Sequence, residues 1–324
     1  MDTKTFDQLI TAAARAPSSH NTQPWRFQRE EDRIVLYADR TRSLPVNDPD
    51  DRELTISCGA ALFNLQVAAA AAGLRPVVEL LPAGEEENRL ATLCLHQNTT
   101  SNVGEMSQLG EAIWLRRTHR GPFSPGRLTP GVIAVLDEAA AEHQVLLRWL
   151  EPATERASVA ELVAAGDQAQ FADPAWRREL ASWMRPRRRG DGLVVPPFLG
   201  IVTRFVVSHF DVGRTSAGKD AALLRNAPQV AVLATREDQR IDWLTAGQAL
   251  QHVLLVAAAK GIAAGYANQP CQVPRLRSRL GDSLALEATP QAVIRFGVAT
   301  TAGRQTPRRP ITEMVAPSAR EQHQ

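Results

Sequence analysis

The segment RAPSSHNTQPWRF, residues 15–27, decides the fold of this chain. It follows an amphipathic helix predicted over 4–15 and leads into a strand predicted over 25–28. Pro17 ends the helix, because proline lacks a backbone N–H and its ring clashes inside a helix. The hydroxyl, imidazole and amide groups that follow suit a flat, polar ligand with several acceptors. They also suit a plain helix end, in which Ser and Asn satisfy backbone groups, and the segment alone leaves both readings open.

A second motif, RRTHRGPF, occupies residues 116–123 and follows a helix predicted over 105–117. Arg116 and Arg120 are four residues apart, so in a helical turn they would share a face and grip one phosphate, with Thr118 as a further donor. The alternative is an exposed basic helix end that the helix dipole favours.

Together the two motifs resemble the nitroreductase superfamily, whose members bind FMN, and in their detailed form its Acg-like branch. In homodimeric members each FMN lies between subunits, one giving the arginine motif and the other the Pro-Ser-Ser loop. Here each motif occurs once in one chain. The resemblance therefore implies one FMN per chain, bound between two halves of the same molecule.

The resemblance also implies the roles of individual residues. Ser18, Ser19 and Asn21 would contact the flavin ring and ribityl chain, while Gln23 braces the loop. The segment 265–269 corresponds to the family segment whose backbone N–H meets flavin N5. The complete expected cofactor-binding set is Pro17, Ser18, Ser19, Asn21, Gln23, Arg116, Arg117, Thr118, Arg120, Lys219 (from a loop before 222–226), Ala267, Asn268, Arg308 and Arg309. No catalytic side chain and no metal ligand is expected.

Two long, nearly all-apolar helices are predicted over 54–72 and 242–260, each followed by a glycine and an apolar strand. This repetition suggests an internal duplication. We therefore expect an α+β, nitroreductase-like fold of two fused halves, 1–103 and 104–324, that form an internal pseudo-dimer. Each half would be a β-sheet flanked by helices around a long buried central helix. The other predicted helices are 129–141, 151–169 and 173–183; the other strands are 34–38, 76–81, 90–96, 145–149, 229–234, 262–266 and 292–298, before a polar tail at 299–324.

Residues 185–200, rich in Arg, Pro and Gly, interrupt this pattern and predict a long irregular loop. Such loops are often lids, and the apolar run 193–198 could cover a flavin face. A mobile surface excursion is the alternative. A third reading is that the run 187–189 binds an anionic partner or the phosphate of the nicotinamide cofactor.

The bulk composition excludes several classes of protein. A net charge of +2 argues against a dedicated nucleic-acid binder, and 44% apolar residues allow a sizeable core. The three cysteines have no metal-ligand spacing, which favours a reducing cytoplasm, and no segment predicts a signal peptide or a membrane span.

Two functions follow from the resemblance. The first is an oxidoreductase with NAD(P)H as co-substrate that reduces nitroaromatic, quinone or similar small-molecule acceptors in a ping-pong cycle. The second is a non-catalytic protein that stores or sequesters FMN beneath a lid. We expect a monomer with its internal pseudo-dimer; a further dimer, the acceptor and the choice of NADH or NADPH stay open.

Overall fold

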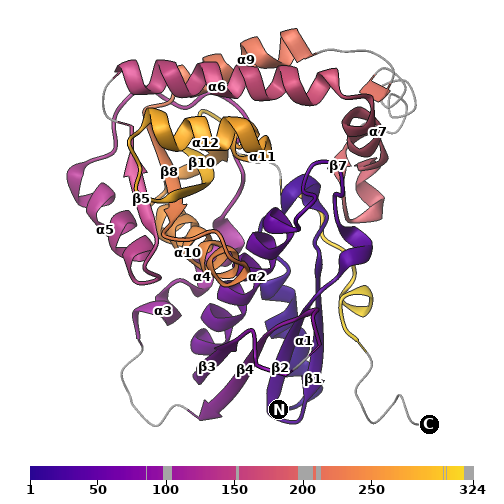
Figure 1. Ribbon diagram of the computed structural model, residues 1–324. Coiled ribbons are helices and arrows are strands. Elements are labelled where there is room, and N and C mark those ends of the chain that lie inside the picture. The colour runs from indigo at the N-terminus through magenta and orange to yellow at the C-terminus, as the bar shows by residue number, and fades with distance from the viewer. Residues whose placement is uncertain are drawn as a thin grey trace.

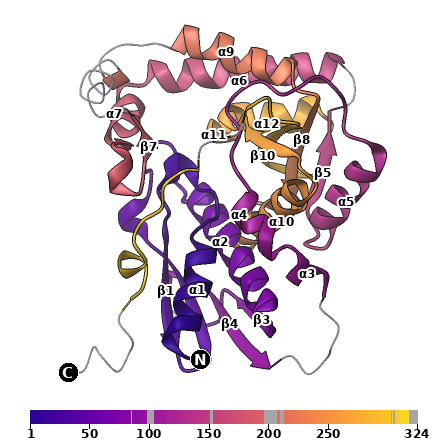
Figure 2. The ribbon, with the colours of Figure 1, turned by 180° about the vertical axis from the view of Figure 1, so that it is seen from behind.

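The computed structural model describes residues 1–84, 86–97, 104–150, 153–195, 207–208, 213–301, 303 and 305–316. It has two four-stranded antiparallel sheets, each built from a successive part of the chain and each accompanied by a long helix (Figures 1 and 2). The fold is α+β, as predicted from the sequence.

The first sheet has the strand order β1-β2-β4-β3, and helices α1 and α2 pack on it. The two predicted strands at 25–28 and 34–38 are β1 and β2, which form a hairpin with Trp25 opposite Ala38. The elements of this half are α1 (Thr3–Ala13), η1 (Ser19–Asn21), β1 (Trp25–Glu30), β2 (Arg33–Ala38), η2 (Arg40–Arg42), α2 (Arg52–Ala71), β3 (Leu74–Leu80) and β4 (Arg89–Gln97).

The second sheet has the order β5-β8-β10-β9 and is covered on both faces. Along β8 the side chains of Ala231 and Leu233 pack toward α5 and α10, and those of Val230 and Val232 toward α6, α9 and α12. The described elements from residue 105 onward are α3 (Glu105–Gln108), α4 (Gly110–Leu115), α5 (Pro130–Ala141), β5 (Leu146–Trp149), α6 (Ala153–Ala172), α7 (Pro174–Ser182), β6 (Met184–Arg185), η3 (Arg187–Arg189), β7 (Leu193–Val194), α9 (Gly213–Arg225), β8 (Gln229–Thr235), α10 (Arg240–Ala259), β9 (Ala263–Tyr266), α11 (Gln269–Gln272), α12 (Pro274–Ser283), β10 (Thr289–Gly297) and η4 (Ile311–Glu313), of which η4 packs beside α1.

The two sheets have the same topology. When the strands of each sheet are numbered along the chain, both sheets have the order 1-2-4-3. In both, the long helix, α2 or α10, lies between the second and third strands. This equality supports the duplication suggested by the sequence.

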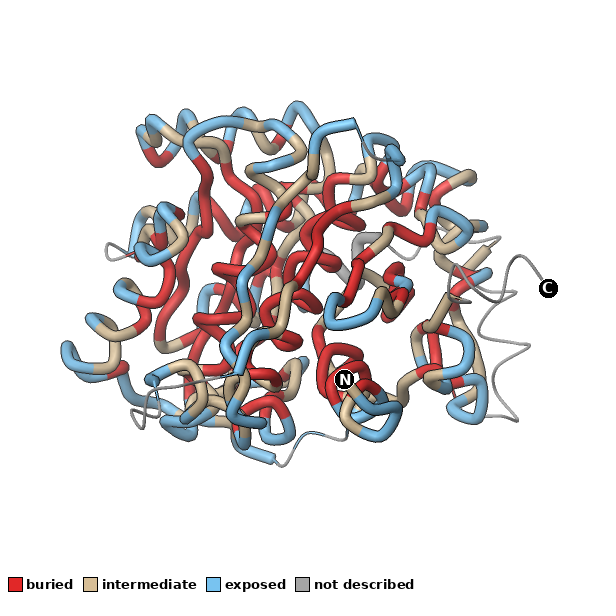
Figure 3. The backbone as a smooth tube through the Cα atoms, turned by 90° about the horizontal axis from the view of Figure 1, so that it is seen from below, coloured by how far each residue is buried: buried red, intermediate tan, exposed pale blue. Residues whose placement is uncertain are grey.

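Helices α2 and α10 pack against each other at two glycines, Gly59 and Gly247, each the eighth residue of its helix. A Cβ on Gly59 would clash with the carbonyl oxygen of Leu244, and a Cβ on Gly247 with that of Ile56. Helix α2 has the length and hydropathy of a membrane span, but 78% of that window is buried inside the protein, as expected of a core helix. Figure 3 shows that the buried backbone is concentrated in the middle of the molecule.

Most predicted helices and strands are present, and three expectations were wrong. The predicted helix 105–117 is two short helices, α3 and α4, and it ends at Leu115. Lys219 lies on a helix, α9, and not on a loop. The end of the chain is more than a polar tail, because Val315 forms a bridge to Phe27 of β1 and Met314 is fully buried. Helices α9, α11 and α12 were not predicted at all.

Two histidines, the half-buried His143 and the buried His252, lie where α5 and α10 meet α2. The rings of His143 and His252 are 5.4 Å apart, and both pack on Phe63. Burial lowers the pKa of each to about 4, and for His252 the neighbouring His143 lowers it further. In the unfolded chain the pKa of a histidine is near 6.5.

We expect this pair to destabilise the fold on acidification. Between pH 6.5 and 4 the unfolded chain binds more protons than the folded one, so the free energy of unfolding falls as the pH falls. One such histidine accounts for at most about 2 kcal/mol at pH 5. The carboxyls of Asp48 and Asp167, whose pKa values are raised to about 7, act in the opposite direction.

The His252→Gln variant isolates the effect, because these carboxyls are common to both proteins. Urea unfolding at pH 7 and pH 5 should show a smaller loss of stability for His252→Gln than for the unaltered chain, by about 1–2 kcal/mol. His96→Gln, at an exposed position on β4, should leave the loss unchanged. An equal loss of unfolding free energy between pH 7 and pH 5 in all three proteins would contradict the lowered pKa of His252.

Candidate functional site

A cavity of about 490 Å³ lies between the two halves. Helix α2 and the loop 17–21 line it from the first half. The second half contributes the arginine motif, α6, α7, α9 and the residues that follow β9. Its size is that of a site for a small molecule or cofactor.

The loop before β1 has an unusual backbone. His20, Asn21 and Gln23 all have positive φ angles, of 49°, 55° and 53°, which residues other than glycine seldom adopt. Hydrogen bonds hold this conformation: Ser18 Oγ accepts from the N–H of Gln23 at 3.0 Å, and Gln23 Oε1 accepts from the N–H of Arg309 at 3.0 Å. Such strain persists where the surroundings over-determine it and is often found at functional sites.

The segment 184–195 braces this loop. Gln23 Nε2 donates to the carbonyl of Gly190 at 2.9 Å, and the N–H of Gly192 donates to the carbonyl of Asn21 at 3.2 Å. Asp191 forms ion pairs with Arg42 and Arg185. This part of the predicted irregular loop is therefore docked and contains the short parallel strands β6 and β7. None of residues 184–195 lines the cavity; the rest of the expected lid, 196–200, lies outside the described residues.

The arginine motif is extended and not helical, which corrects the expected helical face. After α4 ends, Arg116 has φ −56° and ψ 128°, and Thr118 forms a parallel bridge with Ala264 of β9. Along this extended segment Arg116, Thr118, His119 and Arg120 line the cavity, and Arg117 does not. Gly265 allows the close approach, since a Cβ there would clash with the carbonyl oxygen of His119.

At this end of the cavity several cations gather without an anionic partner. In the described part of the chain, no carboxylate oxygen lies within 4.0 Å of a guanidinium nitrogen of Arg15, Arg116 or Arg308. Burial lowers the pKa of Arg116, and the nearby Arg117 and Arg15 lower it further. Two buried donors here, Arg116 Nε and the hydroxyl of Tyr266, have no partner among the described residues. Since unpaired buried donors and charges are costly, this end fits an anionic, acceptor-rich group.

Arg308 also reaches the cavity, but its guanidinium is engaged by the protein. It donates to the carbonyls of Ala14, Arg15 and Ala16 at 2.5, 3.0 and 2.9 Å, and to Asn21 Oδ1 at 3.3 Å. It thus joins the end of α1 to the loop. Arg309 lies away from the cavity, where it donates to the carbonyl of Gln23 and pairs with Asp39.

The cavity brings most of the expected residues together. Gln23, Arg117, Ala267 and Arg309 are the exceptions: Arg117 donates to the carbonyls of Trp114 and Arg116, and the N–H of Ala267 donates to Val293. The expected residues that line the cavity are Pro17, Ser18, Ser19, Asn21, Arg116, Thr118, Arg120, Lys219, Asn268 and Arg308.

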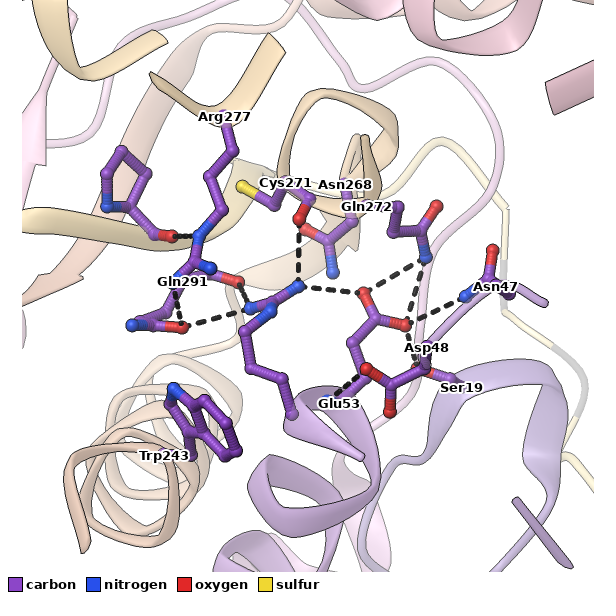
Figure 4. A network of polar contacts seen from close by, with 12 residues as sticks. Ser19, Asn47, Asp48, Glu53, Trp243, Asn268, Cys271, Gln272, Arg277 and Gln291 are labelled. Carbon is purple, nitrogen blue, oxygen red and sulfur yellow. Dashed lines mark hydrogen bonds and ion pairs between the residues drawn. The ribbon is translucent and has the colours of Figure 1, made fainter. Parts of the chain in front are cut away.

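Sequence reasoning missed the buried polar residues on the helices around the cavity. Glu53, at the start of α2, accepts from Ser19 Oγ at 2.6 Å and from Gln272 Nε2 at 3.0 Å, and so connects the loop to the second half (Figure 4). Its own N–H donates to Asp48, whose pKa burial raises to about 7. The other missed lining residues with ionisable side chains are His20, His119, Asp167, Asp220, Tyr266 and Arg295.

Comparison with known proteins identifies the family. Two proteins of Mycobacterium tuberculosis are 31% and 28% identical to this chain over 97% and 96% of its length, and the matches cover 92% and 95% of theirs. Both carry the name "Putative NAD(P)H nitroreductase", the second with the addition acg. The chain belongs to the nitroreductase family.

No protein-family model matches this nitroreductase. Among solved structures it is similar to the FMN-dependent nitroreductase NfnB of Mycobacterium smegmatis, solved with NADPH, at 20% identity. That match covers 66% of this chain and 100% of the other, with a TM-score of 0.44.

Proposed function

We propose that this nitroreductase binds one FMN per chain in the cavity, takes reducing equivalents from NAD(P)H and passes them to a nitroaromatic, quinone or similar acceptor. The observation that carries the proposal is the arginine end of the cavity, where Arg116 Nε and the Tyr266 hydroxyl are buried without a partner in the described chain. The names of the two mycobacterial relatives support it.

The lining residues fit FMN. A phosphate dianion would meet Arg116, Thr118 and Arg120, and its charge would offset the cations that gather there. The polar loop Ser18, Ser19 and Asn21 offers hydroxyl and amide groups to a flavin ring and ribityl chain. In the segment 265–269, expected near flavin N5, Asn268 lines the cavity, whereas Ala267 does not and its N–H donates to Val293 at 2.9 Å.

Bound FMN would supply the redox chemistry, accepting hydride and passing electrons on. The residues of this chain would hold and orient it. Arg308 keeps the end of α1 and the loop together, Glu53 fixes Ser19, and Gln23 and segment 184–195 keep the loop in its strained conformation. A rigid site of this kind limits the reorganisation needed for transfer between two flat rings.

The second candidate is FMN storage. The docked segment 184–195 favours it, because a segment that is tied to the flavin loop by Gly190 and Gly192 could hold a cover over the site. In that case access of NAD(P)H would be blocked while the FMN remains bound.

Anaerobic addition of NADPH and NADH to the purified protein separates the two functions. We expect a yellow flavin spectrum that bleaches on addition of at least one nucleotide. A yellow protein that resists both nucleotides but bleaches with dithionite would contradict the reductase and support storage. A colourless protein that takes up no added FMN would contradict both.

A further inference from the structure

The cavity has a second polar region, formed by Asp167 of α6, Asp220 of α9 and Gln269 of α11. One amide connects the three side chains: Gln269 Nε2 donates to Asp167 Oδ1 at 3.2 Å and to Asp220 Oδ2 at 3.0 Å. We call these three residues the acidic subsite. Helices α6 and α9 run side by side over the second half (Figures 1 and 2), and the arginine motif lies on other elements, next to β9.

Two acceptors of the acidic subsite lack a donor. Asp167 is only 4% exposed, and its Oδ2 atom has no hydrogen-bond partner in the described chain. The Oε1 atom of Gln269 is also buried and without a partner there. A buried acceptor without a donor is costly, so this region fits a ligand that brings N–H or O–H groups. The arginine end is the reverse, with donors that lack acceptors.

The charge of the acidic subsite also favours a ligand with hydrogen-bond donors, and in particular a cationic one. Burial, and then the neighbouring Asp220, raises the pKa of Asp167 to about 7. Two cations lie near Asp220, Lys219 on the same helix and Arg295 on β10, and they oppose the effect of burial on its pKa. Neither comes within 4.0 Å of a carboxylate oxygen of the pair in the part of the chain that the structure describes. Arg295 instead donates to the carbonyls of Gly121 and Leu223, at 3.4 Å each.

The backbone holds the acidic subsite in place. Gly166 precedes Asp167, and a Cβ there would lie 2.6 Å from Cβ of Gln269 and 3.0 Å from its carbonyl oxygen. Helix α6 can therefore approach α11 only because residue 166 has no side chain. The position of Asp167 beside Gln269 is thus built into the packing of two helices.

We propose that the acidic subsite binds the amidinium or protonated amine of an electron acceptor, so that the protein selects cationic acceptors over anionic ones. A planar cation with two N–H groups can donate to Asp167 Oδ2 and Gln269 Oε1 together, and these hydrogen bonds are strengthened by charge. The inference rests on the proposed function only in taking the bound molecule to be the acceptor.

Calorimetric titration of the protein as purified, without removal of any bound flavin, tests the inference. The probes are benzamidine, benzamide and benzoate, which share a ring and differ in charge. We expect benzamidine to bind roughly 10-fold or more tightly than benzoate, with benzamide in between. Benzoate or benzamide binding as tightly as benzamidine, or no binding of benzamidine, would overturn the inference.

Two charge-neutralising variants on α6 provide the matched comparison. Asp167→Asn should weaken benzamidine binding by roughly 10-fold, compared at equal flavin content. Glu161→Gln, which removes the same charge at an exposed position, should have no effect.

The binding of benzamidine should also depend on pH. Asp167 ionises between pH 6 and pH 8, with Asp220, Lys219 and Arg295 as the neighbouring charged groups, so benzamidine should bind more tightly at pH 8 than at pH 6. If Asp167→Asn behaves like Glu161→Gln, the inference is wrong. Flavin content, measured separately by absorbance, tests the proposed function independently.

Discussion

Replacing Arg116 with alanine is expected to weaken FMN binding by about 1.5–3 kcal/mol, roughly 10- to 150-fold in Kd. The reason is that Arg116 is buried at the cavity among other cations and carries a donor, Nε, with no partner in the described chain. The Arg120→Ala variant is expected to lose a similar amount. Equilibrium titration of the flavin-free protein with FMN, followed by flavin fluorescence, measures both.

Arg117→Ala is the matched control for this prediction. It removes the same charge one residue away, from a side chain that does not line the cavity and donates to the carbonyls of Trp114 and Arg116. We expect its Kd for FMN to change by less than about 3-fold, since long-range charge effects are weak and screened by salt. Equal losses of FMN affinity for Arg116→Ala and Arg117→Ala would mean that the overall positive charge of the region, and not a direct contact with Arg116, holds the phosphate.

Gly247→Ala is expected to destabilise the fold by about 3–5 kcal/mol, near the upper limit for single substitutions. The new Cβ would clash with the carbonyl oxygen of Ile56 and lie 2.8 Å from Cα of Gly59. Both are backbone atoms of α2, so the two central helices would have to separate. Because Ser57 on α2 and Leu250 on α10 line the cavity, FMN content should fall as well.

Gly131→Ala, in the first turn of α5, is the control. A Cβ there meets no atom within 4 Å, so the change should be neutral or stabilise the fold by up to about 1 kcal/mol. Chemical denaturation of both variants provides the comparison. A Gly247→Ala protein as stable as the unaltered chain would show that α2 and α10 do not cross at these glycines.

The fold was largely predictable because its signals are local. Helices α2 and α10 are apolar all round, and the strands are short apolar runs bounded by turn residues. The two-residue error at 116–117 is instructive: a helical pattern continued in the sequence, yet the backbone leaves the helix at Arg116 to pair with Ala264 of β9. Tertiary pairing with a distant strand overrides local propensity, and no local pattern encodes it.

The candidate site was predictable only where a motif was present. The loop and the arginine motif were found through a resemblance. Asp167, Asp220 and Glu53 were missed because each lies on a helix among other charged and polar residues and becomes part of the cavity only when distant elements meet. Gly166 within a helix was the one local signal for the acidic subsite, since an interior glycine often marks a close approach.

Titration of the flavin-free protein with FMN and, in parallel, with riboflavin tests the central claim most directly. The two ligands differ only in the phosphate, which we assign to the arginine end of the cavity. We predict one FMN bound per chain, riboflavin bound roughly 10-fold or more weakly, and loss of this difference in Arg116→Ala. Binding of two FMN per chain, or equal affinity for the two ligands, would contradict the account.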